Sequence, residues 1–496
     1  MNQKDVERLN EADHLIQQIA ADFGLDCLPQ EFDVIPAQKM LEIMAYRLPV
    51  NFSHWSFGRD YETERTRWEH GYGAPYEVVF NSDPSRAYLM DTNPFPIQVL
   101  VIAHVYGHND FMKNSLHFQR SRRDMITSAS EAASRFRQYE RDYGADAVER
   151  IIDAALSIQW NIDPDEDRHV ESEEDARERL FGWVHKPAAG GQFDDLLPKK
   201  PEVPTETKRE LRKRTPPEPT VDLLGYLSEH SPRPLAEWEK DILTVIRSQA
   251  TYFMPYRRTK IMNEGWATYW HQKIMRRLFE EKFLSAEDHG FYNLYNARVK
   301  AHNPRSINPY LLGSTLFENI EERWNKGRFG RDYDEEENAA ARAAWDKETG
   351  LGRKKIFGVR RTHMDWFFVD EFLNREVVDA LDLYLYVERE RDNLYESVVE
   401  VTDWKTVKDY LVHSLMNWGI PRILVVDGNY KGSSQLYLKH VFEGLPLDEE
   451  YCTKTLEEIY FLWKRPVYLE TYEPHLHQLR SKLYIADEQG AHVHDE

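Results

Sequence analysis

The chain has 496 residues, 41% of them hydrophobic and 13% aromatic, which is enough material for two or three domains with buried cores. Its formal net charge of -21 argues against broad binding to nucleic acids or anionic membranes, because both need a positive protein surface. Two cysteines exclude a disulfide framework, and neither a signal peptide nor a run of 18 apolar residues occurs, so we expect a cytoplasmic protein without a membrane span.

The first two thirds of the chain show mainly helical periodicity. Apolar residues recur at helical spacing over residues 5–24, 36–46, 97–109, 122–160 (with a break near Gly144), 238–253, 261–284 and 309–325. Residues 76–80 and 87–90 have the composition of strands and flank the turn sequence Asn81-Ser-Asp-Pro84. We therefore predict a mainly helical domain, formed by residues 1–162 and 221–350, that contains a small strand pair.

The segment 163–220 has a different composition. Acidic and basic runs alternate in it, and its second half is rich in proline. Such a segment cannot bury enough apolar surface to offset the entropy lost on ordering. We predict a mobile insertion or an extended strap.

The C-terminal part combines strand-like and helical patterns. Short β-favouring runs occur at 367–369, 383–387, 423–426 and 436–438, and helical patterns occur at 407–415 and 454–463. This mixture predicts an α+β domain over residues 355–475. The remaining residues, 476–496, have the composition of a polar tail.

His104 and His108 form the first candidate site. Residues four apart share one face of a helix, so both imidazoles can bind one metal ion. In zinc metalloproteases with the pattern His-Glu-x-x-His, the glutamate is the general base, and Val105 occupies that position here. The alternative is a pair of core histidines held by hydrogen bonds.

Glu264 is the candidate third ligand, since buried carboxylates are rare unless they are paired or bind a metal. Some metalloproteases take this ligand from an Asn-Glu pair on a later helix, and Asn263-Glu264 is similar. Equally, Glu264 could stabilise a helix N-terminus. His271 shares its helix face and could be a fourth ligand, a proton donor or a partner of a ligand. We expect a divalent metal, with zinc favoured. Glu131, 23 residues after His108, is a second candidate for the third ligand, in a more polar context.

Further polar and aromatic residues could contact a substrate. Lys113 could neutralise an oxyanion in catalysis, or it could form an exposed salt bridge. His54 and Trp55 either line a substrate pocket or form a packed aromatic corner. The candidate substrate-binding residues are His54, Trp55, Asn109, Asp110, Asn114 and Trp266.

Several unusual motifs occur along the chain in one order. They are His54-Trp-Ser-Phe-Gly58, Tyr76-Glu77 with Asn81-Ser-Asp-Pro84, His104-Val-Tyr-Gly-His-Asn-Asp-Phe111, Asn263-Glu-Gly-Trp-Ala267 with His271, and Ile307-Asn-Pro-Tyr310. In these motifs the chain resembles the SpoVR (stage V sporulation protein R) family. The resemblance implies a cytoplasmic protein involved in forming the spore cortex, a modified peptidoglycan layer. It also implies a serine protein kinase and a von Willebrand-type protein as partners, and a role in stress response. It does not supply a biochemical activity.

Three functional hypotheses follow. The first is metal-assisted hydrolysis of a peptide or amide bond related to the cell wall, with His104, His108 and Glu264 as ligands and His271 as proton donor or fourth ligand. Because Val105 replaces the usual base, another carboxylate would have to serve. The second is a non-enzymatic scaffold or regulator that works with the kinase network. The third is a module that binds muropeptides or nucleotides, with the aromatic residues Trp55, Trp266 and Trp270 as a platform.

Overall fold

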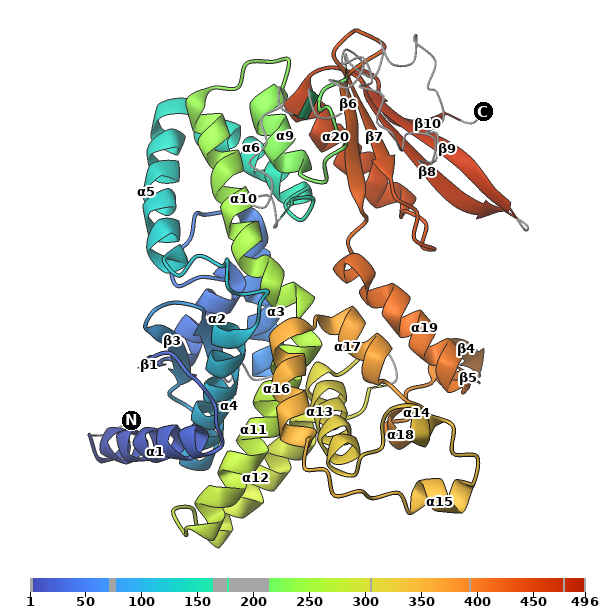
Figure 1. The fold of residues 1–496 in the computed structure, drawn as a ribbon. Helices are drawn as coiled ribbons and strands as arrows, with labels where there is room; N and C mark the ends of the chain where they lie inside the picture. The colour runs from blue at the N-terminus through green and yellow to red at the C-terminus, as the bar shows by residue number, and fades with distance from the viewer. Residues whose placement is uncertain are drawn as a thin grey trace, which may run out of the picture. The chain divides into compact units, whose positions relative to one another are not determined.

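The chain divides into two compact units in the computed structural model (Figure 1). The first comprises Met1–Ala133 and Pro255–Trp418, and the second Ser134–Met254 and Gly419–Glu496. The residues that the structure describes are 3–70, 77–163, 176–177, 214–303, 306–391, 394–475 and 478–494. The predicted insertion 163–220 lies almost entirely outside them.

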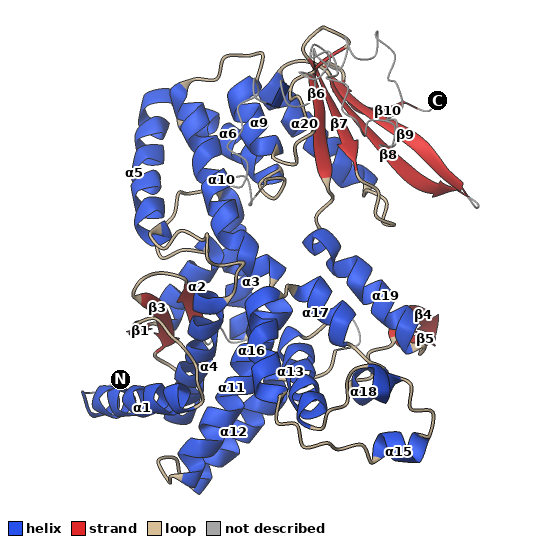
Figure 2. Ribbon diagram, viewed as in Figure 1, coloured by secondary structure: helices blue, strands red, loops and turns tan. Residues whose placement is uncertain are grey.

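The first unit is mainly helical (Figure 2). Its elements are α1 (Gln3–Asp22), β1 (Gln30–Ile35), α2 (Ala37–Tyr46), α3 (Trp55–Glu69), β2 (Glu77–Phe80), β3 (Ser85–Met90), α4 (Phe95–Asn114), α11 (Lys260–Glu280), α12 (Ala286–Val299), α13 (Pro309–Asn325), α14 (Arg331–Asp334), α15 (Ala339–Ala343), α16 (Gly352–Thr362), α17 (Asp365–Phe372), α18 (Arg375–Ala380), β4 (Leu385–Arg391), β5 (Leu394–Val401) and α19 (Trp404–Leu415). β2 and β3 form the predicted antiparallel pair, and β1, which the sequence did not reveal, adds parallel to β3.

The second unit combines helices with a five-stranded sheet. Its elements are α6 (Ala145–Ser157), α9 (Leu223–His230), β6 (Ile423–Tyr430), β7 (Gln435–His440), α20 (Glu449–Trp463), β8 (Val467–His475), β9 (Gln478–Asp487) and β10 (Gly490–His494), together with most of α5 (Met125–Tyr143) and α10 (Glu237–Arg258). The strand order is β10-β9-β8-β7-β6, and α20 packs against β8, β9 and β10. The predicted fold class, a mainly helical domain with a small strand pair and an α+β C-terminal region, is confirmed. Among the described residues, no helix is both long and apolar enough to cross a bilayer.

Two predictions about the C-terminal part were wrong. Residues 367–369 lie in the helix α17 instead of a strand, because the apolar side chains of Phe368 and Phe372 are one helical turn apart and are both buried. Residues 478–487 and 490–494 form β9 and β10 instead of a polar tail. Tyr484 and Ala486 are fully buried and alternate with the partly exposed residues Leu483, Ile485 and Asp487, as expected for a strand with one covered face.

The unit boundaries also differ from the predicted domain boundaries. Residues 355–418 belong to the first unit, although the sequence grouped them with the C-terminal strands. The reason is packing: Ile356 and Val359 of α16 and Phe368 of α17 are fully buried in the core that contains α4, α11 and α13. Such contacts between distant segments leave no local sequence signal.

Glycine residues bring α4, α11 and α13 into backbone contact. A Cβ atom added at Gly107 of α4 would lie 2.6 Å from the Ala267 Cα of α11. A Cβ added at Gly265 of α11 would lie 2.4 Å from the Gly313 backbone of α13, and one added at Gly313 would lie 2.1 Å from the Ile261 carbonyl oxygen. Side chains at these positions would separate the helices.

We predict that Gly313→Ala destabilises the protein by about 1–3 kcal/mol or more, because the added methyl group overlaps backbone atoms that cannot rotate away. Gly58→Ala is the matched control, since a Cβ at this helical position meets nothing within 4 Å and alanine is favoured in helices by about 1 kcal/mol. Urea unfolding followed by circular dichroism measures both. Equal stability of the two variants would contradict the packing argument.

The N-terminus of α11 is stabilised by a carboxylate from another helix. The Asp365 side chain of α17 accepts hydrogen bonds from the backbone N–H groups of Ile261 (2.8 Å) and Met262 (2.9 Å). The N-cap residue Thr259 makes no side-chain cap of its own. Asp365 therefore satisfies N–H groups that a helix start leaves without partners, and it holds the helix that carries Glu264.

Asp365→Ala should destabilise the protein by about 1–3 kcal/mol, because it leaves buried N–H groups without acceptors, whereas Asp365→Asn keeps an acceptor and should cost less. Burial raises the pKa of Asp365 to about 7, although the backbone donors oppose this. Because the pKa of Asp365 is higher in the folded protein than in a free aspartic acid, the stabilisation that protonated Asp365 gives to the folded state is fully present at low pH. It is lost as the pH rises through 7. The stability of the wild type should therefore fall relative to Asp365→Asn between pH 4 and pH 8 in urea unfolding. A pH-independent difference would contradict this.

Candidate metal centre

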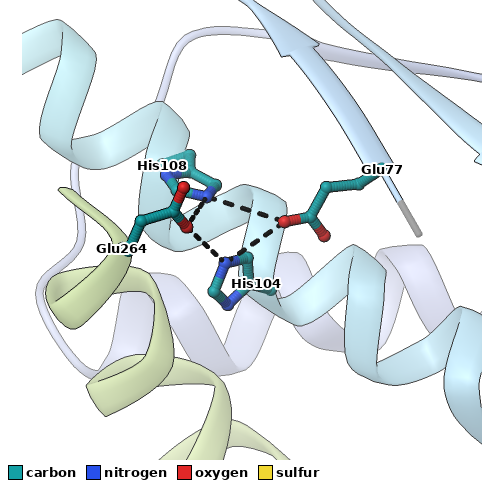
Figure 3. A group of neighbouring side chains, drawn as sticks. All are labelled: Glu77, His104, His108 and Glu264. Atoms are coloured by element: carbon teal, nitrogen blue, oxygen red, sulfur yellow. Dashed lines mark ion pairs between the residues drawn. The ribbon is translucent and has the colours of Figure 1, made fainter. Parts of the chain in front are cut away.

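Two imidazoles and two carboxylates meet in the first unit (Figure 3). His104 and His108 project from α4, Glu264 from α11 and Glu77 from β2. One possible ligand atom from each of the four residues lies within 4.8 Å of all the others. The predicted residues His104, His108 and Glu264 are thus brought together, and Glu77 joins them from the opposite side (Figure 3).

The four side chains surround one point. His104 Nε2 lies 3.2 Å from Glu77 Oε1 and 3.5 Å from Glu264 Oε2. His108 Nε2 lies 3.7 Å and 3.4 Å from the same two oxygens. His104 Nε2 and Glu264 Oε2 are buried atoms without a hydrogen bond of good geometry. Since buried polar atoms normally have such partners, these two atoms suit a cation held between them.

The four side chains of the cluster are electrostatically coupled and differ in exposure. Burial opposes a charge on His108, but the Glu264 and Glu77 carboxylates outweigh it and raise the pKa of His108 to about 10. Burial likewise opposes ionisation of Glu264, but the two imidazoles lower its pKa well below the usual value. The imidazole side chains are only 4% exposed, whereas Glu77 and Glu264 are 17% and 19% exposed. The two carboxylate side chains are therefore less buried than the two imidazoles.

The other ring nitrogen of each histidine is held by a partner. His108 Nδ1 lies 2.9 Å from the Asn263 side-chain oxygen, which can only accept, so Nδ1 carries the proton. His104 Nδ1 lies 2.9 Å from His271 Nδ1. Burial, and next the charge of His104, lower the pKa of His271 well below its usual value, so His271 is neutral and one of the two Nδ1 atoms donates a hydrogen bond to the other. In both rings Nε2 is thus the nitrogen directed at the cluster, and it can bind a metal ion when it carries no proton.

His271 therefore lies behind His104 and is not directed at the four-residue cluster. Of the three roles considered for it, its geometry matches that of a partner that orients a ligand. The helical spacing of Glu264 and His271 placed them on one face correctly. It could not show that His104 would lie between His271 and the cluster.

Tyr310 also borders the cluster. Its ring centroid lies 6.0 Å from that of His104, and it stands in the first turn of α13. The Glu264 charge and then burial raise the pKa of Tyr310 well above its usual value, so its phenol stays protonated and offers an O–H donor beside Glu264. The sequence marked Tyr310 only as part of the Ile307-Asn-Pro-Tyr310 motif.

Three other candidate residues attach α4 to the chain before β1. The Asn109 side chain binds both backbone groups of Leu28, and Asn114 donates to the backbone oxygen of Asp26. The Lys113 ammonium donates to the Asp26 carboxylate (2.5 Å) and the Cys27 backbone oxygen (3.2 Å). Lys113 is thus engaged with a carboxylate, and its predicted contact with an oxyanion gains no support.

Asp110 is completely buried and connects three segments. Its Oδ1 accepts from the Asp26 backbone N–H and its Oδ2 accepts from the Trp266 indole N–H, both at 2.8 Å. The Arg360 guanidinium lies 3.3 Å from Oδ2. Burial raises the pKa of Asp110 to about 6, and Arg360 opposes that shift. Asp110 therefore connects α4 to the segment before β1, to α11 and to α16.

The aromatic candidates fall into two groups. Trp266 and Trp270 are fully buried, so neither offers a surface to a substrate or supports the predicted binding platform. Trp55 is 54% exposed, whereas the His54 side chain caps α3 by accepting from the Ser56 N–H. Glu131 is exposed on α5 and is not among the four clustered residues.

Sequence reasoning missed Glu77 as a member of the cluster. It begins a short strand, where no helical spacing relates it to the histidines. A signal existed nonetheless, because Tyr76-Glu77 was one of the motifs that resembled a known family.

We predict that the purified protein binds close to one equivalent of a divalent metal, measured by elemental mass spectrometry after dialysis. His104→Ala should abolish binding because it removes a ligand. His271→Ala should weaken it about 10–100-fold, because it removes only the partner that orients His104. Glu131→Gln, an exposed carboxylate outside the cluster, is the control and should bind normally. No metal in the wild type, or normal binding by His104→Ala, would contradict the site.

Comparison with known proteins covers almost the whole chain. The family model described as SpoVR like protein matches residues 3–420, and the SpoVR-like C-terminal domain matches residues 421–474. The chain is similar to the "Uncharacterized protein YcgB" of Escherichia coli (strain K12), with 29% identity over 479 residues, 92% of this chain and 90% of that protein. No solved structure matches the chain.

Proposed function

We propose that this chain, which belongs to the SpoVR-like protein family, is a metal-dependent hydrolase with His104, His108 and Glu264 as ligands. The observation that carries the proposal is the meeting of two imidazoles and two carboxylates from α4, α11 and β2 within 4.8 Å. Zinc and similar divalent ions bind imidazole nitrogen and carboxylate oxygen in this combination. The held Nδ1 atoms of both histidines support it, because they present Nε2 as the ligand atom.

A divalent ion at this site would activate water and polarise a carbonyl group. Glu77 is the carboxylate best placed to accept the proton of the attacking water, since it lies opposite Glu264 and is partly exposed. It would thereby replace the base that Val105 cannot provide. The protonated phenol of Tyr310 would supply a hydrogen-bond donor next to Glu264.

The proposed substrate is a peptide or amide bond of peptidoglycan or of its precursors, and the proposed role is in forming the spore cortex. Membership of a family that takes its name from a sporulation protein supports this choice. A protein in the cytoplasm, the location that we propose, would meet such bonds in soluble precursors.

The second candidate function is a scaffold or regulator that works with a serine protein kinase and a von Willebrand-type protein. One observation favours it: Glu77 lies as close to His104 as Glu264 does. Four protein ligands are typical of structural metal sites, whereas catalytic sites keep one position open. If Glu77 is a fourth ligand, the ion holds β2 to α4 and α11 and has no catalytic role.

Glu77→Gln distinguishes the two functions. If Glu77 is the base, the variant should keep its metal and lose about 10²–10⁴-fold in hydrolysis of peptidoglycan-derived peptides, followed by the release of new amino groups. If Glu77 is a ligand, the variant should lose metal affinity instead. Glu131→Gln should change neither property. Absence of turnover by metal-loaded wild type on these peptides, together with metal loss in Glu77→Gln, would contradict the hydrolase and support the scaffold.

A further inference from the structure

A cavity of about 640 Å³ lies beside the β4–β5 hairpin and shares no residue with the metal centre. Its walls come from the α12–α13 loop, the hairpin with the residues before it, and one face of α19. In Figure 1, the hairpin and α19 lie side by side. The volume falls in the range of about 300–1,000 Å³ that is typical of small-molecule sites.

The floor of the cavity is apolar. Val407 and Leu411 are 1% and 7% exposed, and they lie one turn apart on α19. Ile307 and Leu383 complete this surface from the neighbouring loops. An aliphatic part of a ligand would be buried here without leaving polar groups unsatisfied.

Tyrosine rings line the sides. Tyr386 is held in place because its hydroxyl donates to the Asp382 backbone oxygen at 3.0 Å. Tyr384 lines the cavity beside it, and Tyr410 is 56% exposed at the rim. Electron-rich ring faces attract organic cations.

Three carboxylates line the cavity, and a β-bulge places one of them. Leu385 pairs with Val401 and Tyr386 with Val399, so Glu400 is the extra residue of the bulge. Bulges redirect side chains, and Glu400 lines the cavity together with Asp382 and Glu388. None of the cavity-lining residues that the structure describes is a lysine or an arginine.

We propose that this cavity binds a linear aliphatic polyamine. Its methylene groups would lie on the Val407–Leu411 floor, and its ammonium groups would contact Glu400, Asp382 and the tyrosine rings. The combination of apolar, aromatic and acidic lining residues suits this class and disfavours anions. The net charge of -21 raises the local concentration of such cations.

Isothermal titration calorimetry of the full-length protein with spermidine tests the proposal. We expect one saturable site. Glu400→Gln should weaken binding at least tenfold, and Tyr410→Ala should weaken it several-fold with an unchanged fold, because this side chain is exposed. Glu396→Gln is the matched control: it removes the same charge from the same strand, but Glu396 does not line the cavity. His104→Ala should bind spermidine normally, which separates this inference from the metal-dependent function.

Four results would overturn the proposal. They are no saturable binding, equal weakening by Glu396→Gln and Glu400→Gln, displacement of spermidine by Mg²⁺ at the same concentration, and tighter binding of a lysine-containing peptide than of spermidine. The second and third would indicate only diffuse attraction of cations to an acidic surface. The last would identify the cavity as a contact for a basic protein segment.

Discussion

The backbone contact of α4, α11 and α13 at their glycines is the constraint on which the candidate site depends. Gly107 stands next to His108 in the sequence, and Gly265 stands next to Glu264. The positions at which the helices touch therefore lie beside the positions from which the candidate ligands His108 and Glu264 project. A wider helix spacing would move Glu264 away from the two imidazoles, and no side-chain rotation could restore a common ligand distance. The same contact brings Tyr310, at the start of α13, to the edge of the cluster.

Burying four ionisable groups in one place requires that their charges compensate each other. When the imidazoles are protonated, they balance the two carboxylates, as the raised pKa of His108 indicates. When the imidazoles are neutral, a divalent cation would balance the carboxylates instead. The next turn of α4 carries a second buried charge, Asp110, which is neutralised by Arg360 and bound by Trp266. The helix α4 thus contributes to two buried charged sites. The charge of Asp110 is balanced by protein partners, whereas the possible ligand atoms of the cluster of His104 and His108 face one another.

The sequence was informative where the chemistry is local. The spacing of His104 and His108 required only that their segment be helical, and the apolar composition of 97–103 made that helix predictable. Glu264 stood out because a carboxylate in an apolar, aromatic segment needs a partner. Most helices and the β2–β3 hairpin followed from periodicity in the same way. The predictions failed for 367–369 and for the segment after 475, because short apolar runs and polar alternation do not reveal which face another element will cover.

The sequence by itself determined the residue types of the site, the helical pair of histidines and the mainly helical character of the first unit. Only the tertiary structure decided that Glu77 joins that pair, that His271 supports His104 from behind, and that Trp266 is buried against Asp110 and cannot form a binding platform. The physical reason is that these relations cross between segments distant in the chain. They depend on how closely helices approach and on which side of a ring meets a partner, and both are set by packing, which no local periodicity encodes.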